Sequence, residues 1–144
     1  MKVNIDIDCD AEEAIRRLTN MSLRSKNFKP LFYYAQAELR KANASNFAAG
    51  GLPAANGPWQ PRREPKPWPL MIRTGKLLAS LSSLFGPPNS VGMTEAVFGT
   101  RVEYAKFHQY GTTRMPARKI VFEPRGFALD LATKAANYVA NGRL

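Results

Sequence analysis

The chain has 144 residues, 44% of them hydrophobic, and a single cysteine, which predicts one domain over 1–144 and excludes an internal disulfide and a multi-cysteine zinc site. It contains no apolar run of the length that crosses a membrane and no charged-then-apolar leader, so we expect no membrane partner and a reducing cytoplasm as its surroundings. The 21 Lys and Arg side chains outnumber the 11 Asp and Glu, and this net charge of +10 favours an acidic partner, either nucleic acid or an acidic protein surface.

The first elements predicted along the chain are a strand and two helices. Residues 2–8 alternate apolar and polar side chains, which indicates a half-buried strand. A helix over 10–22 follows, opened by a capping box in which Asp10 and Glu13 each satisfy an unpaired backbone N–H group. A second helix over 28–46 carries one apolar stripe and is expected to face the core.

A long Pro- and Gly-rich loop is predicted over 48–69. Proline at this density cannot donate to a helix or a sheet, so the segment should be extended and polyproline-like. Its two tryptophans, Trp59 and Trp68, are costly to expose, so they either fold back onto the domain or anchor another chain. We expect the loop to be mobile in the isolated protein and to be ordered by a partner.

The second half of the chain predicts further strands between short helices. Thr74 caps a short helix, a hairpin has arms near 82–86 and 92–100, a short strand covers 119–122, and a final helix covers 126–140. Together with the amino-terminal elements, this pattern predicts an α+β fold. In that fold a small antiparallel sheet of about four strands has the helices packed mainly on one face.

The densest group of aromatic, basic and turn-forming residues lies over 98–120. Tyr104 and His108 fall on one face of a short predicted helix. His108 and Gln109 are expected to hydrogen-bond the loop 112–116 or a neighbouring subunit. Arg118 offers a rigid fork of donors suited to clamping carbonyls or a carboxylate.

A catalytic role is not predicted. It would depend on His108 with Glu103, Tyr104 or Ser80, and no paired carboxylates, nucleophile elbow, phosphate-binding loop or metal-ligand signature accompanies them. A single histidine on a short helix is more often a packing or hydrogen-bonding residue than a base. We therefore expect a non-enzymatic protein without a metal or another cofactor.

Four motifs follow one another in a specific order: Gly57-x-Trp59-x-Pro61, Leu70-x-x-x-Thr74-Gly75-x-Leu77-x-x-Ser80, Tyr104-Ala105-x-x-His108-Gln109-x-Gly111 and Pro116-Ala117-Arg118. In this order, and over roughly the whole chain, they resemble the phage virion-morphogenesis family. This is the Mu-like tail-completion group, related to the neck proteins that join head to tail. The chain departs from the family pattern at Lys119-Ile120, where relatives often continue Pro-Phe, and in its dense proline insert at 58–69.

The resemblance implies a structural or assembly protein that completes the tail or forms part of the head–tail connection. It would act as a ring-like homo-oligomer with phage tail and head-connector proteins as partners, in the virion and, during assembly, in the host cytoplasm. Trp59 belongs to the common pattern, so Trp59 is expected to be more structural and Trp68 more exposed to contact. The residues expected at subunit or partner interfaces are Trp59, Trp68, Tyr104, His108, Gln109 and Arg118.

The positive charge is unevenly distributed along the chain. Residues 1–13 carry a net charge of −4, residues 14–79 carry +10 and residues 80–144 carry +4. The basic surface is expected at Arg62, Arg63, Lys66, Arg73 and Lys76. These cations are expected to dock an acidic neighbour in the particle, in preference to non-specific contact with genomic DNA. A basic nucleic-acid-binding module is the alternative, although no helix rich in Arg, Asn and Gln stands out.

Overall fold

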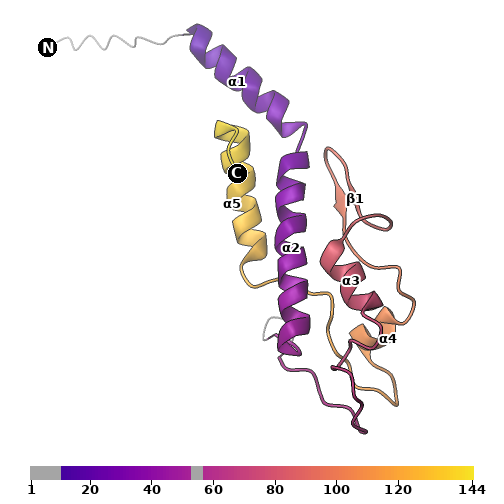
Figure 1. The fold of residues 1–144 in the computed structure, drawn as a ribbon. Helices are drawn as coiled ribbons and strands as arrows, with labels where there is room; N and C mark the ends of the chain where they lie inside the picture. Colours follow the sequence, from indigo (N-terminus) through magenta and orange to yellow (C-terminus); the bar gives the residue numbers. More distant parts are fainter. Residues whose placement is uncertain (1–10, 53–56) are drawn as a thin grey trace, which may run out of the picture.

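The computed structural model describes residues 11–52 and 57–144. Its elements are α1 (Ala11–Ser25), α2 (Lys29–Ala49), α3 (Lys76–Ser83), β1 (Ser90–Val91), β2 (Ala96–Val97), α4 (Ala105–Tyr110) and α5 (Phe127–Asn141). The long helix α2 forms the axis, with α5 along one side and α3 and the hairpin along the other (Figure 1). Helix α1 lies beyond one end of α2, and α4 lies near the other end (Figure 1). None of the helices in this described part combines the length and apolar character that a membrane crossing requires.

The predicted α+β fold is wrong, because the described chain is mostly helical. Its only sheet is the two-stranded antiparallel hairpin that pairs Ser90 with Val97 and Val91 with Ala96. The predicted arm at 82–86 instead contains the end of α3 and the turn that follows it. The predicted strand at 2–8 lies outside the described residues.

The other predicted strand segments within the described residues form no strand, and side chains bond several of their backbone N–H groups. Past β2, the Gly99 N–H donates to Oδ1 of Asn89 at 2.8 Å, and the Val102 N–H donates to Oγ1 of Thr100 at 3.1 Å. At 119–122 the N–H groups of two residues donate to a single glutamine side chain. Local side-chain bonds of this kind compete with a sheet ladder, and periodicity alone does not reveal them.

The three long helices are confirmed close to their predicted bounds. Helix α2 ends at Gly50, whose left-handed φ of 67° ends the helix while its N–H group bonds back to Asn46 and Phe47. Asp10, the predicted cap of α1, lies outside the described residues. The apolar stripe predicted for α2 is only partly the buried face, since Ala35 is its one fully buried member.

Polar side chains of α2 hold the carboxyl end of α3. Gln36 donates to the carbonyl of Leu84 at 2.8 Å, and Asn43 donates to that of Leu81 at 2.9 Å. Arg40 donates to the carbonyl of Ser82 at 3.0 Å. Carbonyls at the last turn of a helix lack partners within the helix, so these bonds both cap α3 and fix its position on α2.

The main hydrophobic cluster forms where the carboxyl end of α2 meets α3 and α4. Its buried members are Phe47, Trp59, Leu77, Leu81, Val102, Ala105 and Ile120. Because these residues come from six separate segments, the cluster ties the loop before α3 to α4 and to the chain after it. This end of the molecule carries the candidate site.

Helices α1 and α5 are attached more loosely, and neither has a fully buried residue. Nη1 of Arg24 donates to the carbonyls of Val139 at 3.1 Å and Ala140 at 3.0 Å, which caps the end of α5. Tyr34 of α2 donates to a carboxylate oxygen of Asp130 in α5 at 2.7 Å, and this bond raises the pKa of Tyr34 to about 12.

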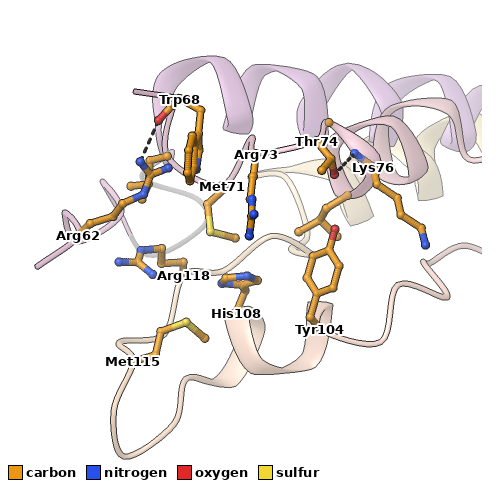
Figure 2. A pocket seen from close by; sticks show the side chains of 13 residues that line it. Arg62, Trp68, Met71, Arg73, Thr74, Lys76, Tyr104, His108, Met115 and Arg118 are labelled. Carbon is orange, nitrogen blue, oxygen red and sulfur yellow. Dashed lines mark hydrogen bonds between the residues drawn. The ribbon is translucent and has the colours of Figure 1, made fainter. Parts of the chain in front are cut away.

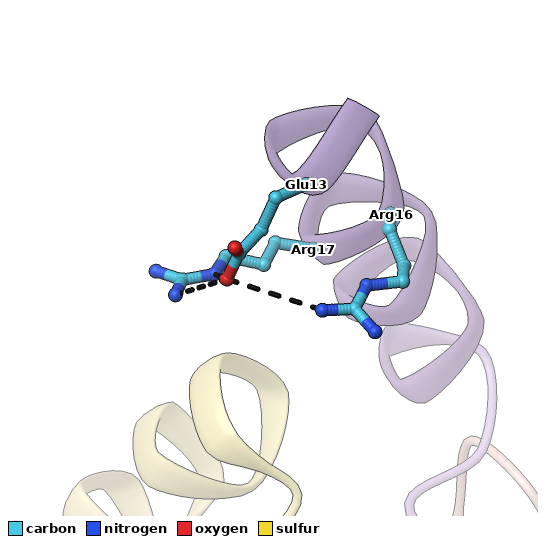
Figure 3. Close-up of polar contacts among 3 residues, drawn as sticks. All are labelled: Glu13, Arg16 and Arg17. Atoms are coloured by element: carbon cyan, nitrogen blue, oxygen red, sulfur yellow. Dashed lines mark hydrogen bonds and ion pairs between the residues drawn. The ribbon is translucent and has the colours of Figure 1, made fainter. Parts of the chain in front are cut away.

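A group of ion pairs lies on the surface of the first turns of α1. Figure 3 shows Glu13 beside Arg17 and Arg16, with Nε of Arg17 donating to Oε1 of Glu13 at 2.9 Å and Nη2 of Arg16 at 3.9 Å from that oxygen. All three side chains are solvent-exposed or nearly so, and exposed pairs of this kind contribute little stability. The attachment of α1 therefore depends more on its contacts with α5, including the bonds from Arg24, than on these ion pairs.

Candidate functional site

Trp59 anchors the proline-rich loop in the core. It is 7% exposed, and its ring meets that of Phe47 edge-on, with the ring centroids 5.2 Å apart. Its Nε1 donates to the carbonyl of Lys119 at 3.0 Å, and Asn46 donates to the same carbonyl at 3.1 Å. A side chain at Gly51 would lie 2.6 Å from the backbone N of Trp59, so glycine is needed for this approach. Trp59 is therefore part of the core, and the partner contact predicted for it stays a prediction.

Arg118 fixes the next part of the same loop. It is only 5% exposed, and it donates from Nε to the carbonyl of Gln60 at 2.9 Å and from Nη2 to that of Pro61 at 3.2 Å. The Arg118 fork thus clamps carbonyls, one of the two uses predicted for it. Burial, and then the nearby charge of Arg62, lowers the pKa of Arg118, but a guanidinium remains protonated at neutral pH.

The carboxyl end of α4 is bonded to the segment 115–118, which runs back past it. The Arg118 N–H donates to the carbonyl of His108 at 2.6 Å, and the intervening loop closes with a bridge between Thr112 and Met115. A Cβ at Gly111 would lie 2.7 Å from the N of Ala117, so only glycine allows the two segments to approach this closely.

Gln109 uses its amide within the chain. Its Nε2 donates to the carbonyl of Val121 at 2.8 Å, and its Oε1 accepts from the N–H groups of Ile120 and Val121, each at 2.9 Å. These three bonds hold the segment that sequence patterns predicted as a strand. The partner contact predicted for Gln109 stays a prediction. Ile120, at one of the family departures, is fully buried.

These contacts leave a cavity of about 540 Å³ between the loop, the start of α3 and α4, which we call the basic pocket (Figure 2). Its lining residues are Arg62, Trp68, Leu70, Met71, Arg73, Thr74, Gly75, Lys76, Leu77, Tyr104, His108, Met115 and Arg118. Seven of them were predicted as interface or basic-surface residues. They come from two stretches separated by about thirty residues, and only the tertiary fold brings them together.

The predicted residues outside the basic pocket are few. Trp59 lies in the core and Gln109 beside Val121, as described above. Arg63 lines a more open hollow together with the 112–116 loop, and Lys66 pairs with Glu64 at 3.1 Å. Of the five residues predicted as basic surface, the basic pocket therefore contains three: Arg62, Arg73 and Lys76.

The charged side chains that line the basic pocket are all positive among the residues that the structure describes. Four of these lining residues are cations, and none carries a carboxylate. The guanidinium groups of Arg62 and Arg73 lie 5.8 and 5.4 Å from the ring centre of Trp68, within cation–π range. Arg62 also donates to the carbonyls of Trp68 at 2.8 Å and Pro69 at 2.6 Å, so its charge is held in place.

His108 forms part of the wall of this pocket. Its ring meets that of Tyr104 edge-on, with the ring centroids 6.0 Å apart. Burial, and then the charge of Arg118, lowers the pKa of His108 from its ordinary 6.5, so the ring is neutral at pH 7. Its Nδ1 is buried and has no hydrogen-bond partner in the described part of the chain.

Sequence patterns did not indicate the apolar part of the lining. Met71 has a left-handed φ of 66°, uncommon for a residue with a side chain, and its side chain extends toward the cavity beside Arg73 (Figure 2). Met115 lines the opposite side, near Arg118. Neither position carries a signal in sequence, because methionine occurs equally in cores and in adaptable binding surfaces.

The arrangement fits binding better than catalysis. Among residues 11–52 and 57–144, no group of three His, Cys, Asp or Glu side chains could hold a metal ion. The lone imidazole contacts the Tyr104 ring and lies near the charge of Arg118, and no carboxylate among the described lining residues orients it as a base. A pocket with four cations, two aromatic rings and an apolar wall is suited to a ligand that combines negative charge with apolar groups.

Comparison with known proteins gives a family match over most of the chain. The model of the phage virion morphogenesis family matches residues 9–134. A relative from Haemophilus influenzae, called Mu-like prophage FluMu G protein 2, is 28% identical over 127 residues, which cover 88% of this chain and 83% of that protein. No solved structure matches the chain.

Proposed function

The chain belongs to the phage virion morphogenesis family, and from this premise we propose that it completes the phage tail or forms part of the head–tail connection. Membership makes it a structural, non-enzymatic protein of phage assembly. Its proposed working form is a ring-like homo-oligomer at the tail end or neck of the virion, built in the host cytoplasm. Its proposed neighbours there are tail and head-connector proteins.

The observation that carries the oligomer is the apolar surface left exposed by the described residues. On α1, Ile15 and Leu18 are 64% and 65% exposed. On α4, Tyr110 is 81% exposed, and Leu129 on α5 is 74% exposed. Single exposed apolar residues are ordinary, but Ile15 and Leu18 lie three positions apart on one face of α1 and together form an exposed apolar surface suited to packing on another chain.

The test combines oligomer mass with assembly of phage particles. Ile15→Asp with Leu18→Asp should reduce the oligomer to smaller species in light scattering, and it should fail to restore tails in a phage that lacks this protein. Thr19→Asp adds a charge at an exposed polar position of the same helix and should preserve both properties. If a phage without this protein makes complete, infectious particles, the proposed role is wrong.

A nucleic-acid-binding module is the second candidate, favoured by the net charge of +10. The arrangement of the cations supports docking of an acidic protein instead. Arg118 and Arg62 are committed to backbone carbonyls, and the cations of the basic pocket surround a recess. Duplex DNA presents its phosphates on a convex surface, which meets cations on an open face more readily than those in a recess.

A further inference from the structure

The acidic amino-terminal segment has a pattern that complements the basic pocket. Residues 1–10, which we call the arm, precede α1 and lie outside the described residues. In sequence, Ile5 and Ile7 alternate with Asp6 and Asp8. In an extended conformation, the two carboxylates would lie on one side about 7 Å apart, with the isoleucines on the other side.

The basic pocket offers groups that match this pattern. The side chains of Arg73 and Lys76 are exposed and form no ion pair within residues 11–52 and 57–144. Beside them, Met71 and Leu70 present partly buried apolar groups. Charge and apolar surface therefore both fit an acidic, alternating peptide.

We propose that the arm of one copy docks as an extended segment in the basic pocket of a neighbouring copy. This inference rests on the proposed function, because it specifies how the homo-oligomer is held together. Asp6 and Asp8 would meet Arg73 and Lys76, and the isoleucines would cover the apolar wall of the basic pocket.

The arm is too short to reach the basic pocket of its own chain. Helix α1 has 15 residues and is about 22 Å long, and α2 from Lys29 to Phe47 adds about 27 Å. Ala11 begins α1 at the end away from α2, whereas α4, which helps to line the pocket, lies near the opposite end of α2 (Figure 1). Asp6 is five residues before Ala11, which allows a reach of at most about 18 Å. The contact must therefore join two chains.

A contact between an arm and a neighbour's pocket uses two different surfaces and is therefore head-to-tail. Such contacts close into rings when the rotation between subunits allows, and otherwise they extend into filaments. Each copy would give one arm and receive one arm, so every copy in a closed ring would make the same two contacts. It would also bring the exposed apolar face of α1 close to the next subunit.

Two charge reversals test the proposal. The arm variant carries Asp6→Lys and Asp8→Lys, and the pocket variant carries Arg73→Glu and Lys76→Glu. Each variant alone should have the mass of a single chain in light scattering, because like charges then meet. An equimolar mixture should recover the oligomer, since each arm then finds a pocket of opposite charge. An arm variant that assembles like the unaltered chain, or a mixture that stays monomeric, would overturn the proposal.

The native cysteine gives a second measurement that does not depend on charge. Cys9 directly follows Asp8, so Thr74→Cys at the rim of the pocket should form disulfides between chains, seen as a ladder in denaturing gels. Ala136→Cys, exposed on α5, is the matched control and should form far fewer. Equal ladders in the two variants would contradict the docking site.

The inference and the proposed function can fail separately. If the reversed pocket does not fold, as judged by circular dichroism, Arg73→Gln with Lys76→Gln replaces it and should still weaken the oligomer. If a chain lacking residues 1–8 still oligomerises and completes tails, the arm proposal is wrong and the function stands. If the pocket variant keeps its oligomer but loses a tail protein, the pocket has a different occupant and the proposal is also wrong. If the unaltered chain never enters the particle, the proposed function fails.

Discussion

The guanidinium of Arg118 and the carbonyl of Gln60, 58 residues apart in sequence, lie 2.9 Å from each other, donor to acceptor. Through this bond the segment after α4 holds the proline-rich loop in the place where it lines the basic pocket. The arginine that ends the Pro-Ala-Arg motif is thus an internal clamp, and its charge also contributes to the pocket that it shapes.

We predict that removing the clamp destabilises the protein and frees the loop. Arg118→Ala should lower the free energy of unfolding by about 2–3 kcal/mol, because two carbonyls lose a charged donor. Urea denaturation measures this, and limited proteolysis should show faster cleavage between Gln60 and Pro69. Arg63→Ala, at an exposed neighbouring position, should change the stability by less than about 0.5 kcal/mol. Equal losses in the two variants would show that the clamp is not the cause.

The two tryptophans should separate folding from assembly. Trp59→Ala empties a core site and should cost about 3–5 kcal/mol of folding stability. Trp68 is only partly buried, so Trp68→Ala should cost much less stability while reducing oligomer formation or tail complementation. Denaturation curves and particle assembly, measured on both variants, check this. A Trp68→Ala protein that unfolds as easily as Trp59→Ala would contradict it.

His108 should make the protein less stable in mild acid. Its pKa in the folded state lies below the ordinary 6.5, so the unfolded chain binds this proton more readily than the folded chain. The folding stability that depends on a neutral His108 is therefore fully present above about pH 6.5, and it is lost as the pH falls through the pKa of His108 in the folded state. Urea titrations at several pH values should show a smaller loss in His108→Gln over this range. NMR titration of the imidazole gives the direction of the shift directly.

Any binding to DNA should be sequence-independent and should weaken steeply with salt. Arg73→Gln with Lys76→Gln should reduce the slope of log affinity against log salt by up to about 2, if both cations meet phosphates. A docking role predicts little DNA affinity, and salt-sensitive binding to a protein instead. Titrations of one duplex at two salt concentrations distinguish these outcomes. Binding that survives high salt and prefers one sequence would support the nucleic-acid module.

The loop mobility inferred from composition also stays a prediction. Trp59, Arg118 and Arg62 give the described part of the loop several fixed points, through core packing and through bonds to carbonyls. Protease mapping of the isolated chain tests it, and a fragment resistant throughout 50–69 would contradict it.

The sequence by itself determined the long helices, the family and most of the site residues. Helical periodicity extends over several turns and needs no distant partner, so α1, α2 and α5 were predicted near their observed bounds. The order of the four motifs identified the family, because a motif depends only on residue identity and spacing. Strands were overpredicted, since pairing is a long-range property that short alternation cannot report, and Gln109 and Asn89 took the backbone groups of the predicted strands.

Only the tertiary structure decided what those residues do together. Trp59 and Trp68 have similar neighbours in sequence, yet one is in the core and the other lines the basic pocket, because Phe47 and Lys119 approach only the first. Arg118 and Arg73 are both cations, yet one bonds carbonyls and the other faces the cavity. Convergence of this kind depends on how α2, α3 and α4 pack, and no local pattern in the chain encodes that packing.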